Sequence, residues 1–148
     1  MININDKIPN LSAKNQDDKD ISLLNFIGKK LVIFFYPKAN TTGCTAEACD
    51  LNNNIENFKR LNYAIIGISA DSVKKQKAFH QKYNLQYDLL ADESKEIINA
   101  FGVWGRKKFM GKEYDGILRT TFIFNEQGIL ENIITDVKTK NHTQQILK

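Results

Sequence analysis

The feature that most constrains the fold is an unbroken apolar run at residues 31–36, LVIFFY. The run is rich in β-branched and aromatic residues, which favour a strand. Because no polar residue alternates with the apolar ones, the pattern predicts a central strand that is buried on both faces. Pro37 follows and has no backbone N–H for a continuing ladder, so the strand is expected to end there.

Helical patterns flank this strand. Upstream, Ser22 is expected to cap a short helix that runs through Phe26 and stops at Gly28, after a polar turn at 15–20. Downstream, the pattern predicts a helix over residues 42–60. Its apolar residues recur at spacings of three and four and give it one apolar face; they are Ala48, Leu51, Ile55 and Phe58.

Two further pairs of a strand and a helix follow along the chain. The strand patterns lie at 63–69 and 87–90, and the helical ones lie at 73–83 and from Asp92 to about Phe101. Asp71 and Asp92 are the expected N-caps, since a short polar side chain accepts hydrogen bonds from the first helical turn. Asn84 follows the end of the first helix, and Gly102 takes the C′ position of the second.

The C-terminal part of the chain has a different pattern. Residues 103–115 carry two glycines and no clear periodicity, so an irregular surface loop is expected. Strands are predicted at 120–124 and 129–134, and the four residues between them end in Gly128, as in a hairpin. Asn141 is the expected cap of a short last helix.

This order of elements predicts the fold class. Alternating strands and helices followed by an antiparallel hairpin indicate an α/β protein, with a central mixed β-sheet flanked by α-helices. The order suits a thioredoxin-like fold, and residues 1–148 are expected to form a single domain because the chain has no linker-like segment and no repeat. In such sheets chemistry tends to sit beyond the C-terminal ends of parallel strands, where the residues after Tyr36 lie.

Composition narrows the class of protein. The formal net charge is +4, but the basic residues are scattered, so a solvated surface is expected rather than a nucleic-acid interface. The N-terminal residues lack the apolar core of a signal peptide, and the run at 31–36 is far too short to span a bilayer. A cytoplasmic protein with no membrane partner is therefore expected.

The two cysteines, Cys44 and Cys49, lie close together in the sequence. In a reducing cytosol such a pair is more often catalytic, redox-active or metal-binding than structural. A metal is disfavoured because the chain has no CxxC motif and its two histidines, His80 and His142, are far from the cysteines in sequence. We expect no metal and no cofactor, and we assign neither histidine any chemistry.

Cys44 has the placement of a reactive thiol. If Thr41 is the N-cap of the helix at 42–60, Cys44 is the third helical residue, where unpaired backbone N–H groups and the helix dipole favour an anion. The thiolate is the nucleophilic form of cysteine, so this placement favours reactivity. The alternative from the residues alone is a buried, inert thiol, since cysteine is among the most buried residue types.

Three sequence segments carry a family resemblance. Pro37, Thr41 and Cys44 match the PxxxTxxC motif of peroxiredoxins. The wider string FFYPKANTTGCTAEACDL, with FGVWG at 101–105 and FMGKEYDGI at 109–117, resembles the bacterioferritin comigratory protein or peroxiredoxin Q subfamily. Many members have proline where this chain has Thr42, and its absence is expected to loosen the first helical turn without abolishing the chemistry.

The resemblance implies a thiol-dependent peroxidase that reduces hydrogen peroxide and organic hydroperoxides. Cys44 would attack one peroxide oxygen and become a sulfenic acid, Thr41 would orient the peroxide, and Pro37 would keep bulk water off the thiolate. Arg119 would stabilise the thiolate and the charge on the leaving oxygen. From the residues alone, Thr41 is equally a plain N-cap and Arg119 an ordinary surface residue.

Glu47 follows Cys44 by three residues and therefore lies on a similar face of the helix. A carboxylate beside a thiolate disfavours the thiolate. Two roles are open for Glu47: it holds Arg119 in place, or it interacts only with the helix dipole.

Cys49 follows Cys44 by five residues. In an intact α-helix this spacing puts the two Cα atoms about 8.6 Å apart, whereas a disulfide needs them within about 7 Å. The two thiols therefore cannot bond while the helix is whole. The resemblance names Cys49 as the resolving cysteine, and the first helical turns would then unwind in each cycle. The alternative is a core thiol at Cys49, with resolution by an outside thiol.

The resemblance further implies a monomer that thioredoxin, or glutaredoxin, reduces. Two other classes of function stay open from the residues. One is a thioredoxin-type disulfide oxidoreductase, which normally uses a CxxC motif that this chain lacks. The other is a non-enzymatic redox sensor or metal carrier. Trp104 is expected to have a packing role rather than to contact substrate.

Overall fold

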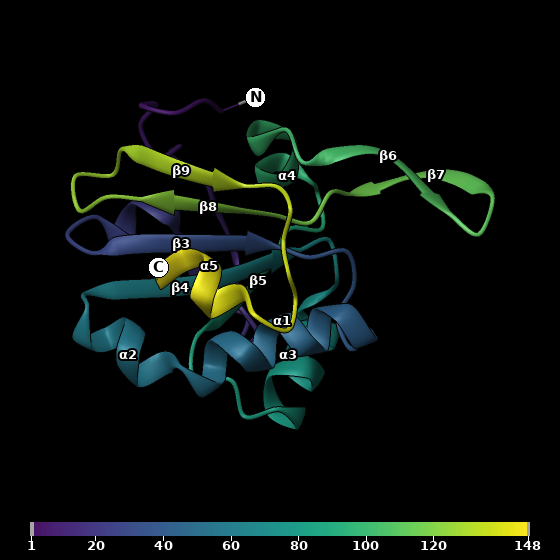
Figure 1. The fold of residues 1–148 in the computed structure, drawn as a ribbon, viewed down its shortest axis with the longest axis horizontal. Helices are drawn as coiled ribbons and strands as arrows, with labels where there is room; N and C mark the ends of the chain where they lie inside the picture. The colour runs from purple at the N-terminus through teal and green to yellow at the C-terminus, as the bar shows by residue number, and fades with distance from the viewer. Residues whose placement is uncertain (1, 148) are drawn as a thin grey trace.

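The computed structural model describes residues 2–147 (Figure 1). Its strands are β1 (Ser12–Lys14), β2 (Asp20–Ser22), β3 (Lys30–Phe35), β4 (Tyr63–Ser69), β5 (Asp88–Ala91), β6 (Trp104–Phe109), β7 (Lys112–Ile117), β8 (Thr120–Phe124) and β9 (Leu130–Ile134). Its helices are the 3₁₀ helix η1 (Leu23–Phe26) and α1 (Thr42–Asn53), α2 (Ile55–Arg60), α3 (Val73–Lys82), α4 (Glu96–Phe101) and α5 (His142–Leu147). Among the described helices, none is long and apolar enough to cross a membrane.

Seven strands form one mixed sheet in the order β2-β1-β5-β4-β3-β8-β9. Strand β3 lies near its centre, parallel to β4 and antiparallel to β8. The side chains of β3 alternate between two hydrophobic clusters, with Ile33 and Phe35 in one and Val32 and Phe34 in the other. The predicted burial of this strand on both faces is therefore confirmed, as is the α/β class.

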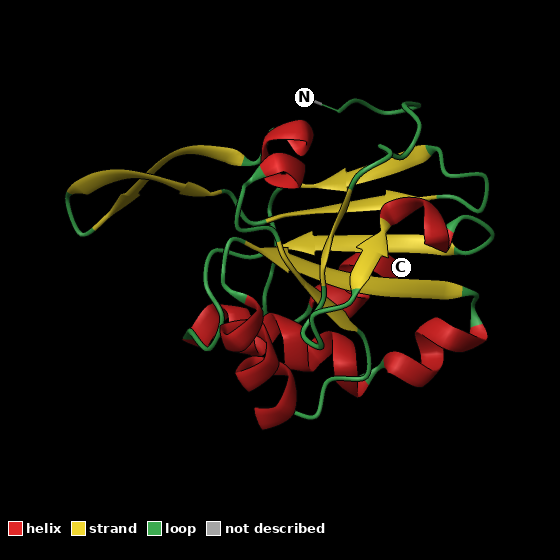
Figure 2. Ribbon diagram, turned by 180° about the vertical axis from the view of Figure 1, so that it is seen from behind, coloured by secondary structure: helices red, strands yellow, loops and turns green. Residues whose placement is uncertain are grey.

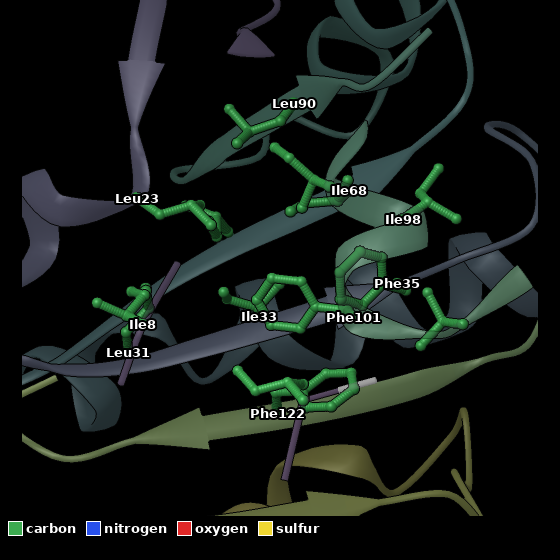
Figure 3. Packing of buried hydrophobic residues seen from close by; sticks show 14 of the residues in the cluster. Ile8, Leu23, Leu31, Ile33, Phe35, Ile68, Leu90, Ile98, Phe101 and Phe122 are labelled. Carbon is green, nitrogen blue, oxygen red and sulfur yellow. The ribbon is translucent and has the colours of Figure 1, made fainter. Parts of the chain in front are cut away.

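Helices cover both faces of the sheet. The face that carries Val32 and Phe34 is covered by α1, α2, α3 and α5, which contribute Leu51, Phe58, Phe79 and Ile146. The opposite face is covered by α4 and the N-terminal segment, and Phe101 of α4 lies there beside Phe35 and Phe122 (Figure 3). Figure 1 shows α1, α2 and α3 together, away from α4.

The predicted helix at 42–60 is two helices. Asn54 lies between α1 and α2 with φ −109° and ψ 15°, and its side-chain amide donates to the carbonyl oxygen of Asp50 at 2.8 Å. A short side chain that bonds to the nearby backbone in this way competes with the regular helical ladder. The apolar face nevertheless continues across the break, since Leu51, Ile55 and Phe58 are all buried.

Of the caps predicted for η1, α3 and α4, the first is confirmed and the other two are corrected. Ser22 caps η1, its hydroxyl accepting from the backbone N–H of Leu24. The N-cap of α3 is Ser72 and not Asp71, because the Asp71 carboxylate instead accepts from the loop that follows β3. The N-cap position of α4 is Lys95 rather than Asp92, although the Asp92 carboxylate does accept from the N–H of Ile98 inside that helix.

The predicted loop at 103–115 is wrong, because β6 and β7 form an antiparallel hairpin there. Met110 and Gly111 both have positive φ, 53° and 80°, as a tight two-residue turn requires. Arg106 pairs with Asp115 across the strands at 3.2 Å. The hairpin projects from the body of the protein (Figures 1 and 2). Much of it is exposed on both faces, so the alternation of apolar residues that usually marks a strand is missing.

Strands β1 and β2 were also not predicted. They flank the expected polar turn and pair with each other from Ser12 opposite Ser22 to Lys14 opposite Asp20. Each has only three residues, too few for a periodicity to stand out. Helix α4 begins at Glu96, four residues after the predicted cap Asp92, and the remaining strands and helices lie within one or two residues of their predicted bounds, including α5 after Asn141.

Replacing Phe101 by alanine should destabilise the protein strongly. The ring is fully buried and packs against three other aromatic rings, those of Phe35, Phe122 and Phe124. Truncation leaves a cavity, so Phe101→Ala is expected to lower the free energy of unfolding by about 3–5 kcal/mol in urea denaturation. The control Met110→Ala, at a side chain that is 87% exposed, should change it by less than about 0.5 kcal/mol. Equal effects of the two substitutions would contradict the close packing of Phe101 in the core.

Candidate active site

The loop between β3 and α1 is held by the residues that follow β4. Because β3 and β4 are parallel, their C-terminal ends lie at the same edge of the sheet. Asp71 accepts a hydrogen bond from the backbone N–H of Ala39 at 2.8 Å and another from the hydroxyl of Ser69 at 2.7 Å. This carboxylate ties the turn after Pro37 to the neighbouring strand, and the turn leads directly into α1.

Cys44 lies inside the first turn of α1. Thr41 has the extended backbone of an N-cap residue, so Cys44 is the third residue of the helix, as expected. Its side chain is buried, and Nη2 of Arg119 donates a hydrogen bond to Sγ at 3.3 Å. The helix N-terminus and the guanidinium both favour an anion at this sulfur.

Thr41 does not cap the helix through its side chain. Its hydroxyl instead donates to the carbonyl oxygen of Lys38 at 2.8 Å. A hydroxyl has one proton and two lone pairs, so Oγ1 in this orientation can only accept from a further partner. A peroxide O–H group is a partner of that kind.

Arg119 reaches Cys44 from the residues just before β8. Strand β8 is antiparallel to β3 and places Thr120 opposite Phe35, which brings Arg119 to the C-terminal end of β3. Nη1 of Arg119 donates to Oε1 of Glu47 at 2.8 Å, so one guanidinium joins the carboxyl group and the thiol. Gly43 leaves room for this approach, since a Cβ atom there would lie 3.2 Å from Nη2.

Glu47 is fully buried beneath this guanidinium. Burial raises the pKa of its carboxyl group to about 7, and the positive charge of Arg119 only partly opposes the rise. The structure thus places Glu47 on Arg119, one of the two roles left open by the sequence. The carboxyl group also lies 3.5 Å from Nε2 of His142, a residue to which the sequence assigned no chemistry.

Cys49 lies on the same helix and is half-buried. Burial raises the pKa of its thiol. Both cysteines are free thiols and α1 is helical from Thr42 to Asn53, so the distance argument for an intact helix applies. A bond between Cys44 and Cys49 requires this helix to change.

A pocket of about 410 Å³ opens beside the Cys44 loop. All of its lining residues except Ala70 come from the loop after β3 and from the β6–β7 hairpin, among them Pro37, Thr41, Trp104, Lys107, Tyr114 and Ile117. The lining is mostly apolar. Trp104 therefore faces a pocket at the protein surface rather than the core, with the ammonium group of Lys95 4.9 Å from its ring centroid.

Lys107 is a residue of this pocket that the sequence analysis did not single out. Its ammonium group donates to the carbonyl oxygen of Ile117 at 2.9 Å, and burial, together with the nearby charge of Arg119, lowers its pKa. Tyr114 was missed too. Both residues lie in or beside segments that carry the family resemblance, which could have pointed to them. Because these segments were predicted to be an irregular loop, their position relative to Cys44 could not be predicted.

Comparisons with known proteins show the family to which the chain belongs. A model of the AhpC/TSA family matches residues 4–133. The chain is 41% identical over 142 residues to peroxiredoxin Bcp of Escherichia coli K12, covering 96% of this chain and 91% of that protein. The bacterioferritin comigratory protein of Xanthomonas campestris has a TM-score of 0.89 at 30% identity, with 98% and 95% of the two chains covered. A peroxiredoxin Q variant of Xylella fastidiosa has a TM-score of 0.92 at 27% identity, with 99% and 94% covered.

The chain therefore belongs to the AhpC/TSA family, and it is a thiol peroxidase with a thioredoxin-like fold. Among these enzymes it is a peroxiredoxin of the bacterioferritin comigratory protein and peroxiredoxin Q type. The fold class and the enzyme class predicted from the sequence are confirmed. The presence of two cysteines fits an atypical two-cysteine peroxiredoxin.

The raised pKa of Glu47 predicts how stability depends on pH. The folded carboxyl group titrates near 7 and the unfolded one near 4.5, so the folded state binds more protons between these values. Stability from this group is complete below pH 4.5 and is lost as the pH rises through 7, by up to about 3 kcal/mol. Urea denaturation from pH 4.5 to pH 8 should show this loss in the wild type relative to Glu47→Gln.

The matched control is Glu56→Gln, which removes an exposed carboxylate from α2. Its free energy of unfolding, relative to the wild type, should stay within about 0.5 kcal/mol over the same pH range. A difference between the wild type and Glu47→Gln that does not change with pH would show that Glu47 titrates normally.

Proposed function

We propose that Cys44 is the peroxidatic nucleophile. The observation that carries this proposal is the contact of one guanidinium, that of Arg119, with both Sγ of Cys44 and the buried Glu47 carboxyl group. A fixed cation beside a thiol at a helix N-terminus stabilises the thiolate before the reaction and the charge on the leaving oxygen during it.

The first half of the reaction needs only these groups and the peroxide. The peroxide donates a hydrogen bond to Oγ1 of Thr41, whose own proton is held by the carbonyl oxygen of Lys38. The thiolate attacks the nearer oxygen, the O–O bond breaks, and its electron pair leaves with the other oxygen. That oxygen takes up a proton and departs as water or an alcohol, and Cys44 becomes a sulfenic acid. Pro37 lines the pocket and keeps bulk water from the sulfur.

Cys49 completes the cycle as the resolving cysteine in this proposal. Its thiolate attacks the sulfenic sulfur, hydroxide leaves and is protonated to water, and a Cys44–Cys49 disulfide forms. The spacing on an intact α1 forbids that bond, so the first turns of the helix unwind. The enzyme therefore alternates between a helical reduced form and an oxidised form with a shorter α1.

The reductant and the setting of the reaction are part of the same proposal. A dithiol protein such as thioredoxin attacks the exposed disulfide and returns both thiols. Both cysteines come from one helix of one chain, so a monomer contains all the redox-active groups. A reducing compartment such as the cytoplasm keeps the thiols ready between cycles.

We propose organic hydroperoxides with an apolar substituent as substrates alongside hydrogen peroxide. The structure of the Xanthomonas campestris relative was studied for its alkyl peroxide reduction activity. In this chain the pocket beside Cys44 has apolar walls from Trp104, Tyr114 and Ile117, and Thr41 lies among the same lining residues. An alkyl or aryl group in this pocket would leave the peroxide end close to the helix N-terminus.

Two cysteine substitutions separate the steps. Cys44→Ser should abolish peroxide consumption in a thioredoxin-coupled assay, because no thiolate attacks the peroxide. Cys49→Ser should consume about one equivalent of peroxide in a single burst without turnover, because nothing in the chain resolves the sulfenic acid. In the wild type, one equivalent of peroxide should give a Cys44–Cys49 disulfide on peptide mapping, with loss of helix by circular dichroism. A stable sulfenic acid in the oxidised wild type would rule out the resolving role of Cys49.

Tyr114→Ala tests the substrate pocket. Removing an apolar wall should lower kcat/KM for cumene hydroperoxide about tenfold, since contact with an aromatic ring is worth roughly 1–2 kcal/mol. The value for hydrogen peroxide, which has no apolar group, should change less than about twofold. Met110→Ala is the control, because this apolar residue lies at the exposed tip of the same hairpin. Equal losses for both peroxides would argue against the pocket as the site of the substituent.

A further inference from the structure

The second oxygen of the Glu47 carboxyl group lacks a conventional partner. Oε1 accepts from Arg119, but among the described residues no group forms a hydrogen bond with Oε2. Nε2 of His142 lies 3.5 Å from this oxygen. Both side chains are completely shielded from solvent. A buried carboxylate oxygen without a hydrogen bond costs free energy, and this cost favours the protonated form of Glu47.

The hydrogen bonds of His142 define where its ring proton lies. Nδ1 is 2.8 Å from Oε1 of Gln145, an oxygen that also accepts from the backbone N–H of Lys138. The amide nitrogen of Gln145 donates to the carbonyl oxygen of Asp136, which establishes the orientation of the amide. Because the amide oxygen only accepts, Nδ1 carries the proton of the neutral ring.

Nε2 of the neutral ring is therefore an acceptor. The hydroxyl of Thr121, on β8, lies 2.7 Å from it and donates its proton. The ring nitrogen has only one lone pair, so a Glu47 carboxylate meets an acceptor and no donor at Nε2. A proton on Oε2 removes this repulsion and competes with the Thr121 hydroxyl for the lone pair of Nε2.

We propose that His142 is a positioning residue of the peroxidase, which shares one proton with Glu47 and thereby sets the charge that Arg119 meets opposite Cys44. The proposal rests on the role of Arg119 under the proposed function. With the proton in place, the Glu47–His142 pair is neutral and the guanidinium faces one anion, the Cys44 thiolate. Without the proton, the carboxylate competes with the thiolate for the same cation.

The charged and titratable groups around Glu47 and His142 also affect whether this pair binds a proton. Asp50 on α1 and the buried phenol of Tyr87 supply no positive charge that would stabilise the Glu47 carboxylate. The negative charge of Asp50 instead raises the pKa of Glu47. Arg119 is the cation that opposes proton uptake by Glu47. Burial also lowers the pKa of His142, so the proton resides mainly on the carboxyl group rather than on the ring. The pair therefore holds its proton below about pH 7 and loses it above.

The α5 helix has a second contact with α1, which provides a control. The backbone N–H of Thr143 donates to the carboxylate of Asp50 at 2.7 Å, and the Thr143 hydroxyl donates to the Asp50 carbonyl oxygen at 3.2 Å. Thr143→Ala weakens the docking of α5 and leaves the imidazole in place. His142→Gln removes the titrating ring and supplies an amide N–H that can bond to Oε2.

The direct test is the titration of Glu47 by carbon-13 NMR of its side-chain carboxyl group in the reduced enzyme, assigned with Glu47→Gln. The wild-type midpoint is expected near pH 7. In His142→Gln it should fall by at least about one pH unit, because the amide donor stabilises the carboxylate. Thr143→Ala and His80→Gln, the same substitution in α3, should leave the midpoint unchanged. An unchanged midpoint in His142→Gln would overturn the proposal, because it would show that His142 is a packing residue only.

The kinetic test compares second-order rate constants for hydrogen peroxide. At pH 6 about nine-tenths of the wild type holds the shared proton, against half or less of His142→Gln, so the wild type should react about twofold faster or more. At pH 8.5 neither holds the proton, and the ratio should approach one. In a Glu47→Gln background, His142→Gln should have no pH-dependent effect. A ratio that stays constant with pH would overturn the proposal.

The two measurements also separate this inference from the function on which it rests. If Cys44→Ser retained peroxidase activity while the Glu47 midpoint still moved in His142→Gln, the assignment of the nucleophile would fail. The shared proton would in that case be upheld by the NMR titration alone.

Discussion

The bridge that Arg119 makes between Cys44 and Glu47 is the interaction on which the rest of the site depends. A guanidinium brought this far from solvent needs a hydrogen-bond acceptor beside it, and the buried carboxyl group of Glu47 supplies one from the same helix as the thiol. Asp71 ties the loop that leads to α1 to the end of β4, and β8 brings Arg119 to the end of β3. The sheet thus brings a carboxyl group and a nucleophile, both on α1, together with a cation that comes from the residues just before β8.

The same helix has two requirements that oppose each other. An intact α1 presents Cys44 to its N-terminal dipole and to Arg119, while the proposed disulfide with Cys49 requires the first turns to unwind. These turns must therefore be stable enough to hold Cys44 beside Arg119, and unstable enough to unwind when the disulfide forms. Thr42, the first residue of α1, lacks the fixed φ that a proline would supply at this position. Contacts from α5 to Asp50 add stability further along, so the two ends of α1 are held by different means.

Particular elements show what could be predicted from the sequence. The apolar run of β3, the buried strand β4 and the N-cap at Thr41 were found because each depends on neighbours within a few residues. The β6–β7 hairpin was missed because its turn, Met110-Gly111, lacks the usual Asn-Gly or Asp-Gly signal. The pocket walls that the hairpin contributes were missed with it. Asp71 was predicted to cap α3 because it immediately precedes the helical pattern. Its actual contact, with the backbone N–H of Ala39, joins two loops that are distant in sequence and leaves no local pattern.

The sequence by itself determined that a buried strand leads into a helix with Cys44 in its first turn, and the motif around that cysteine indicated a peroxidase. It left open whether Arg119 meets Cys44, whether Glu47 meets Arg119 or only the helix dipole, and it assigned His142 no chemistry. The tertiary structure decided these contacts, in which Cys44 and Arg119 are 75 positions apart. The physical reason is that local periodicity reports which face of an element is buried, whereas only sheet register and helix packing decide which distant polar groups meet there.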